Sequence, residues 1–95
     1  MNTLYTIPAN TETVTFTATH YGKHGNVKTH VVLSLEQDAN DGLFDLNVGT
    51  IKAGKSRIYT YGFPTRKAAL AELKRQAIRY TFIQSVANVT FTTKD

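Results

Sequence analysis

Apolar and polar residues alternate one by one along most of the first two thirds of this chain. The clearest case is residues 13–19, where Val14, Phe16 and Ala18 alternate with four threonines. A period of two places successive side chains on opposite faces of a β-strand. Threonine also favours strands, because its branched Cβ fits a pleated surface. The alternation therefore predicts a strand with one buried face and one polar face.

Three further strands are expected, each bounded by a segment of turn-forming residues. They are predicted at residues 27–36, 43–51 and 56–63. Within residues 27–36, Val32 is an apolar residue on the otherwise polar side of the strand. The turns between them contain glycine with asparagine, aspartate or lysine, which supply the backbone freedom that hairpins need. They lie near Gly22 to Asn26, over residues 37–42 and over residues 52–55.

At Pro64 the apolar period changes from two to 3.6, which predicts a helix with Thr65 as its N-cap. Leu70, Leu73 and Ala77 fall on one stripe of this helix. The opposite side carries charged residues, namely Glu72, Arg75 and Arg79. One face of the helix is therefore expected to pack on the sheet.

The two ends of the chain are less regular. The apolar stripe of the helix ends near Tyr80, but Asn88 tolerates a left-handed backbone and leaves open a longer helix capped there. Residues 4–7 and 89–92 are expected to add short strands. The predicted fold class is α+β, an antiparallel β-meander of four to five strands with one amphipathic helix packed on one face. Ninety-five residues predict a single domain, 1–95.

Gly49 to Ser56 match the phosphate-loop pattern G-x-x-x-x-G-K-[ST]. That motif needs a helix directly after the loop, because its N-terminus attracts the phosphates. Here the residues after Ser56 alternate as a strand, and no apolar strand ends in an aspartate that would hold magnesium. The segment is therefore predicted to be a lysine-bearing hairpin turn.

Other residue clusters lack the spacing of a metal or catalytic site. His20, His24 and His30 surround the first turn with no carboxylate nearby to orient them. Acidic residues around the second turn do not follow the register of a calcium loop; they are Glu36, Asp38, Asp41 and Asp45. We therefore expect no enzyme activity, no catalytic or metal-binding residues and no cofactor.

The location of the protein is predicted from what the chain lacks. It has no cysteine and no apolar run of about 18 residues, so neither disulfides nor a membrane span are expected. Residues 1–6 contain neither the basic nor the apolar part of a signal peptide. A cytoplasmic protein is expected, in the host cytoplasm if a phage encodes the chain.

The net charge of +4 is unevenly distributed. Residues 1–51 hold two basic and five acidic residues, a net charge of −3, whereas residues 52–79 hold eight basic residues and one acid, a net charge of +7. Such a basic segment favours an anionic partner. Its basic residues are Lys52, Lys55, Arg57, Arg66, Lys67, Lys74, Arg75 and Arg79.

The predicted binding site consists of these eight residues together with Tyr59 and Tyr61. Arg57 and the two tyrosines share one face of the fourth strand, where cations and aromatic rings would contact phosphates and bases. Arg66 and Lys67 occupy the first helical turn, which disfavours cations unless an anion binds there. Two alternatives remain open: the tyrosines pack under the helix, and the basic helix face is an ordinary solvated surface.

Residues 61–73, YGFPTRKAALAEL, resemble the strand-to-helix junction of the arm-binding N-terminal domains of phage integrases. Those domains carry a glycine, an aromatic residue and Thr-Lys/Arg-Lys-x-Ala at the start of the helix. The resemblance covers about residues 43–75 and implies a sheet that docks in a DNA groove with the helix behind it. This chain departs from the family at Ala68, where glutamate is usual, and in having more than three strands.

The chain is also similar in type to small phage-encoded inhibitors of bacterial defence, including anti-CRISPR proteins. Such inhibitors commonly occupy a nucleic-acid path or a subunit surface of a ribonucleoprotein. Three hypotheses follow from the sequence. The first is a non-enzymatic module that binds nucleic acid or a ribonucleoprotein complex. The second is an inhibitor that binds a host protein and blocks it sterically, and the third is an assembly protein whose strands pair edge to edge. The oligomeric state is not predicted.

Overall fold

Four consecutive strands form an antiparallel meander in the computed structural model, which describes residues 3–83 and 85–93. The strands are β1 (Thr11–Gly22), β2 (Gly25–Gln37), β3 (Phe44–Lys52) and β4 (Lys55–Phe63). Met1 and Asn2, on which the prediction of the compartment partly rests, lie outside the described residues.

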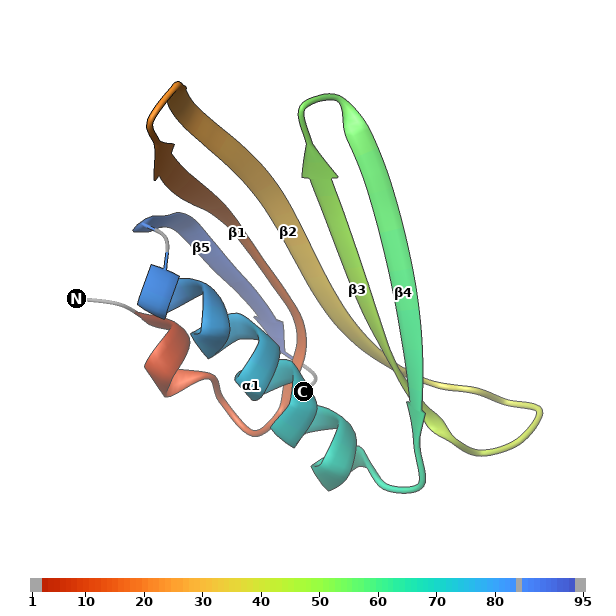
Figure 1. The fold of residues 1–95 in the computed structure, drawn as a ribbon. Coiled ribbons are helices and arrows are strands. Elements are labelled where there is room, and N and C mark those ends of the chain that lie inside the picture. Colours follow the sequence, from red (N-terminus) through yellow and green to blue (C-terminus); the bar gives the residue numbers. More distant parts are fainter. Residues whose placement is uncertain (1–2, 84, 94–95) are drawn as a thin grey trace.

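The chain then crosses one face of the sheet as helix α1 (Arg66–Ile83) and returns as strand β5 (Ser85–Thr93). Strand β5 pairs with β1, so that the order across the sheet is β4-β3-β2-β1-β5 with every pair antiparallel. Figure 1 shows α1 on one face of the sheet, with β3 and β4 extending beyond it. The predicted α+β class, with one helix on one face of an antiparallel sheet, is confirmed.

The core lies between α1 and the face of the sheet that the alternation predicts to be apolar. Val14, Leu33 and Val48 are aligned across β1, β2 and β3 and are all buried. Leu73 and Ala77 on α1 are fully buried above the sheet. Burial of each large aliphatic side chain contributes about 1.5–3 kcal/mol, so this one face supplies most of the stability of the domain.

The opposite face of the sheet carries the predicted threonines of β1 and no helix among the described residues. Val32 lies on this face and is 45% exposed, as its place in the alternation predicts. Thr13 and Thr92 join β1 to β5 through a hydrogen bond between their hydroxyl groups.

The predicted strand at residues 4–7 is wrong. Thr3–Thr6 form a short 3₁₀ helix, and the side chains of Leu4 and Ile7 are buried beside α1. Positions three apart align in a 3₁₀ turn, so the spacing of these two apolar residues suits that turn. A run of four residues is too short for alternation to distinguish the two conformations.

Asn88 has the expected positive φ of 58°, but it does not cap the helix. Helix α1 ends at Ile83, and Asn88 lies inside β5, which is longer than the predicted strand at 89–92. The pairing of β1 with β5 shifts between Thr15 and Thr17, and Asn88 lies at this irregularity. A left-handed residue suits a β-bulge as well as a helix cap, so conformation alone does not locate the helix end.

The start of α1 agrees with the sequence. The Thr65 hydroxyl accepts a hydrogen bond of 3.1 Å from the backbone N–H of Ala68. This bond satisfies one of the N–H groups that the first helical turn leaves unpaired, so Thr65 is the N-cap.

The segment that matches the phosphate-loop pattern forms a tight hairpin, as predicted. Gly49 belongs to β3, Lys55 and Ser56 belong to β4, and Ala53 with Gly54 make the two-residue turn. Both turn residues have positive φ, 52° for Ala53 and 76° for Gly54. This combination matches the twist of the flanking strands and fixes which residues of β3 and β4 face each other.

Replacement of Ala53 by asparagine is expected to stabilise the protein. A left-handed backbone costs alanine about 1–2 kcal/mol, and asparagine tolerates it better. The Ala53→Asn variant should raise the free energy of unfolding by up to about 1 kcal/mol and the Tm by a few degrees. Urea and thermal unfolding measure the change, and Ala53→Val, whose branched Cβ suits a positive φ poorly, should do the opposite. A less stable asparagine variant would contradict this account of the turn.

Candidate functional site

Both hairpin turns lie at the same end of the sheet, here called the turn end (Figure 1). The pairing of Thr29 with Lys52 fixes this arrangement, because β2 begins and β3 ends there. Lys23 and Lys28, which the charge count by segment placed in the acidic half of the chain, therefore lie near the basic β3–β4 turn. The alternation alone does not show which strands pair, so the sequence pattern did not predict the position of these two lysines.

The acidic residues gather at the opposite end of the sheet, here called the loop end. Asp45 pairs with Glu36, and the loop between β2 and β3 carries Asp38 and Asp41. Partial burial of Asp45 raises the pKa of its carboxyl group, and the charges of Asp38, Asp41 and Glu36 raise this pKa further. The side chains of Asp38 and Asp41 accept hydrogen bonds of 2.8 Å from nearby backbone N–H groups, which close the loop.

A hollow of about 330 Å³ opens at the turn end on the face of the sheet that carries α1. Thr29, Lys52 and Lys55 form one row across the strands, and Thr50 and Arg57 form part of the next row. The hollow is lined by Thr29, Thr50, Lys52, Lys55, Arg57 and Tyr80. Three cations and three hydroxyl groups can donate hydrogen bonds to phosphate oxygens, and no carboxylate is among these lining residues.

Tyr80 forms the helix side of this hollow. Its ring packs edge to face on Phe16, with the ring centroids 5.3 Å apart and the planes at 71°. Burial raises the pKa of Tyr80, and the charge of Arg79 partly counteracts this effect. Tyr80 therefore keeps its hydroxyl proton at neutral pH and can donate a hydrogen bond into the hollow.

Tyr59 and Tyr61 lie on the same face of β4 as Arg57, as predicted. They pair with Val48 and Leu46, which are both buried, so the tyrosines face the helix side of the sheet. Even so, Tyr59 remains 51% exposed and Tyr61 remains 43% exposed. The alternative that the tyrosines pack under the helix is correct for the face of the sheet on which they lie. About half of each residue nevertheless remains accessible to solvent.

Arg66 is held by two backbone carbonyl groups at the start of β1. Its guanidinium group donates hydrogen bonds of 2.5 Å to the carbonyl oxygen of Ala9 and 2.7 Å to that of Thr11. These bonds join the start of α1 to the start of β1, which lie far apart in the sequence. They give Arg66 a structural role that the sequence pattern did not indicate.

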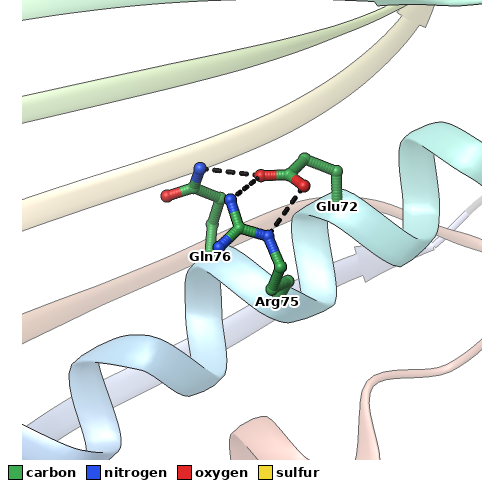
Figure 2. A network of polar contacts seen from close by, with 3 residues as sticks. All are labelled: Glu72, Arg75 and Gln76. Carbon is green, nitrogen blue, oxygen red and sulfur yellow. Dashed lines mark hydrogen bonds and ion pairs between the residues drawn. The ribbon is translucent and has the colours of Figure 1, made fainter.

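Arg75 is bound within the helix, as Figure 2 shows. It donates hydrogen bonds of 2.8 Å and 2.5 Å to the two carboxylate oxygens of Glu72, and Gln76 donates a third of 2.8 Å. The bond from Arg75 lowers the pKa of Glu72, so this acid stays ionised and offsets the charge of Arg75. The Arg75 side chain still keeps 61% of its surface exposed.

The ten predicted binding residues therefore separate into three groups. Lys52, Lys55 and Arg57 line the hollow, with Tyr59 and Tyr61 following on β4. Arg66 and Arg75 are engaged in the contacts described above. Three basic residues lie on α1 without lining the hollow, namely Lys67, Lys74 and Arg79.

Across the described residues, no group of three or more histidine, cysteine or acidic side chains could hold a metal ion. His30 contacts a threonine and not a metal-binding group: its Nδ1 atom lies 3.1 Å from the Thr17 hydroxyl oxygen, within hydrogen-bond distance.

A second, apolar hollow of about 300 Å³ lies on the opposite face of the sheet. Val32, Ile51 and Ile58 surround Gly49 there, and Ile58 is 75% exposed. The missing side chain of Gly49 leaves the space between its neighbours open. The sequence indicated only Val32 as an apolar residue on this face.

Within residues 3–83 and 85–93, no helix combines the length and the apolar character that a membrane span requires. Comparison of the chain with protein-family models, with curated proteins and with solved structures gives no match.

Replacement of Arg66 by lysine should destabilise the fold although it conserves the charge. An ammonium group cannot reproduce the fork that reaches the Ala9 and Thr11 carbonyls together. We expect the free energy of unfolding to fall by about 1–2 kcal/mol in urea denaturation. The neighbouring exposed residue provides the control, since Lys67→Arg should change stability by less than about 0.5 kcal/mol. Equal stability of both variants would exclude the structural role of Arg66.

Replacement of Asp45 by asparagine should raise the Tm at pH 7. The raised pKa means that the folded state binds a proton at Asp45 more readily than the unfolded state does. Ionised Asp45 therefore disfavours folding above its folded pKa, and this penalty disappears as the pH falls below the ordinary value of 3.8. Thermal unfolding at a series of pH values should show the advantage of Asp45→Asn shrinking as the pH falls. A gain of the same size at pH 3 would contradict the assignment.

Proposed function

We propose that this protein is a non-enzymatic module that binds nucleic acid, free or within a nucleoprotein, at the turn end of its sheet. The observation that supports this function best is the hollow with three cations, three hydroxyl groups and no lining carboxylate. Lysine and arginine bind phosphates by charge-assisted hydrogen bonds, and phosphate contacts provide most of the affinity of non-specific nucleic-acid binding.

The separation of charge supports the same site. Lys23 and Lys28 add positive charge at the turn end, although the side chain of Lys28 lies on the face of the sheet opposite the hollow. The carboxylates of Glu36 and Asp45 lie at the loop end. A polyanion would therefore be attracted to the turn end and repelled from the loop end. This separation of charge along the sheet favours one orientation of the bound molecule.

The double substitution Lys52→Gln/Lys55→Gln should weaken nucleic-acid binding. Fluorescence anisotropy with labelled oligonucleotides over a salt series measures the affinity and its salt dependence. We expect a loss of roughly tenfold near 0.1 M salt, and a salt slope reduced by about 0.7 to 0.9 for each phosphate contact removed.

The matched control is Lys67→Gln/Lys74→Gln, which removes the same charge from α1 away from the hollow. It should weaken binding much less. Equal losses in the two double variants would mean that net charge, and not the hollow, governs binding. Absence of binding by the unmodified protein at low salt would exclude the proposed function.

A second candidate is an inhibitor that binds a host protein, and the apolar hollow around Gly49 favours it. Exposed Ile58, Ile51 and Val32 provide the apolar contact that a protein interface needs at its centre. Capture of partners from a host lysate with and without nuclease distinguishes the two functions. A partner that survives nuclease and is lost in Ile58→Lys, but not in Lys52→Gln/Lys55→Gln, would support the inhibitor.

A further inference from the structure

We infer that the nucleic acid is single stranded and lies along the helix-side face of β4. In this arrangement the phosphates enter the hollow at Lys52, Lys55 and Arg57, and two bases stack on Tyr59 and Tyr61. The inference rests on the proposed function and adds the class of nucleic acid and its path.

The first support is the continuity of this path. Residues 55, 57, 59 and 61 alternate along one strand, so their side chains share the helix-side face and run in one line. Strand β4 is an edge of the sheet, and its paired strand lies only on the other side. A ligand can therefore approach this line from the open edge without displacing another strand.

The second support is the unusual exposure of the tyrosines. Their cross-strand partners, Val48 and Leu46, are buried in the core, and yet about half of Tyr59 and Tyr61 stays exposed. An aromatic ring that is held from one side by its own sheet and is open on the other is a ready stacking surface. Bases of any identity stack on such rings, which makes this kind of binding tolerant of sequence.

The third support is the spacing of the two rings. Alternate residues on a strand lie about 6.7 Å apart, whereas successive bases of a duplex strand rise by about 3.4 Å. Bases inside a duplex also have both of their faces covered by neighbouring pairs. Tyr59 and Tyr61 therefore suit a stretched single strand with its bases unstacked, and they do not suit a duplex.

The fourth support is the size of the hollow. The hollow itself, at about 330 Å³, is at the lower end of ligand-pocket volumes, which suits a single nucleotide unit better than a duplex.

The test compares Tyr59→Leu/Tyr61→Leu with Tyr59→Phe/Tyr61→Phe. Leucine keeps apolar bulk but has no ring, whereas phenylalanine keeps the ring and loses only the hydroxyl group. The probe is labelled oligo-dT of about 15 nucleotides, with oligo-U of the same length and a blunt duplex as further arms. Circular dichroism and the Tm establish that each variant is folded, and Tyr61→Leu alone serves if the double leucine variant is not.

The unmodified protein should bind the single strands at least tenfold more tightly than the duplex. The leucine variant should lose at least tenfold in affinity for them with an unchanged salt slope, and the phenylalanine variant should stay within about twofold. Oligo-dU, which differs from oligo-U only in its sugar, then shows by the ratio of the two affinities which sugar is preferred.

Two results would overturn the inference: tighter binding of the duplex, or equal affinity of the leucine and phenylalanine variants for the single strands. Either result leaves the proposed function standing if Lys52→Gln/Lys55→Gln still weakens binding. If that lysine variant binds every oligonucleotide as well as the unmodified protein does, the proposed function itself fails.

Discussion

The pairing register of β3 with β4 is the constraint on which the rest of the site depends. The two-residue turn at Ala53 and Gly54 sets this register, which places Lys52 opposite Lys55 and Thr50 opposite Arg57. Side chains alternate with a period of two, so a slip of one residue would move every side chain of β4 to the other face. The same slip would bring Ile58 to the helix side and turn Lys55 and Arg57 away from the hollow.

The hollow also exists because one helix cannot cover five strands. Strands lie about 4.8 Å apart, so this sheet is about 20 Å wide, whereas a helix with its side chains is about 10–12 Å across. Helix α1 covers the central strands, and the edge strand β4 extends beyond it (Figure 1). The core residues of β3 are therefore buried while Tyr59 and Tyr61, one strand further out, stay accessible.

The sequence predicts local features of this fold well, because alternation and helical periodicity report directly on which face is buried. The four meander strands, the Thr65 cap and the common face of Arg57 with the tyrosines all follow from such patterns. Contacts between segments that lie far apart in the sequence cannot be predicted from such patterns. Nothing in the local pattern indicates that Arg66 reaches the carbonyl groups at the start of β1, or that Lys28 lies near the β3–β4 turn.

The arrangement of charge along the strands matters more than the net charge. Strand β3 has nine residues and so spans about 30 Å, which is nearly four times the Debye length of about 8 Å at physiological salt. The cations of the turn end are therefore screened from the acids of the loop end and act on an approaching polyanion almost alone. A chain with a modest overall charge of +4 thus presents one strongly basic end. In the proposed complex, this charge would draw the phosphates to the hollow before any base reached the tyrosines.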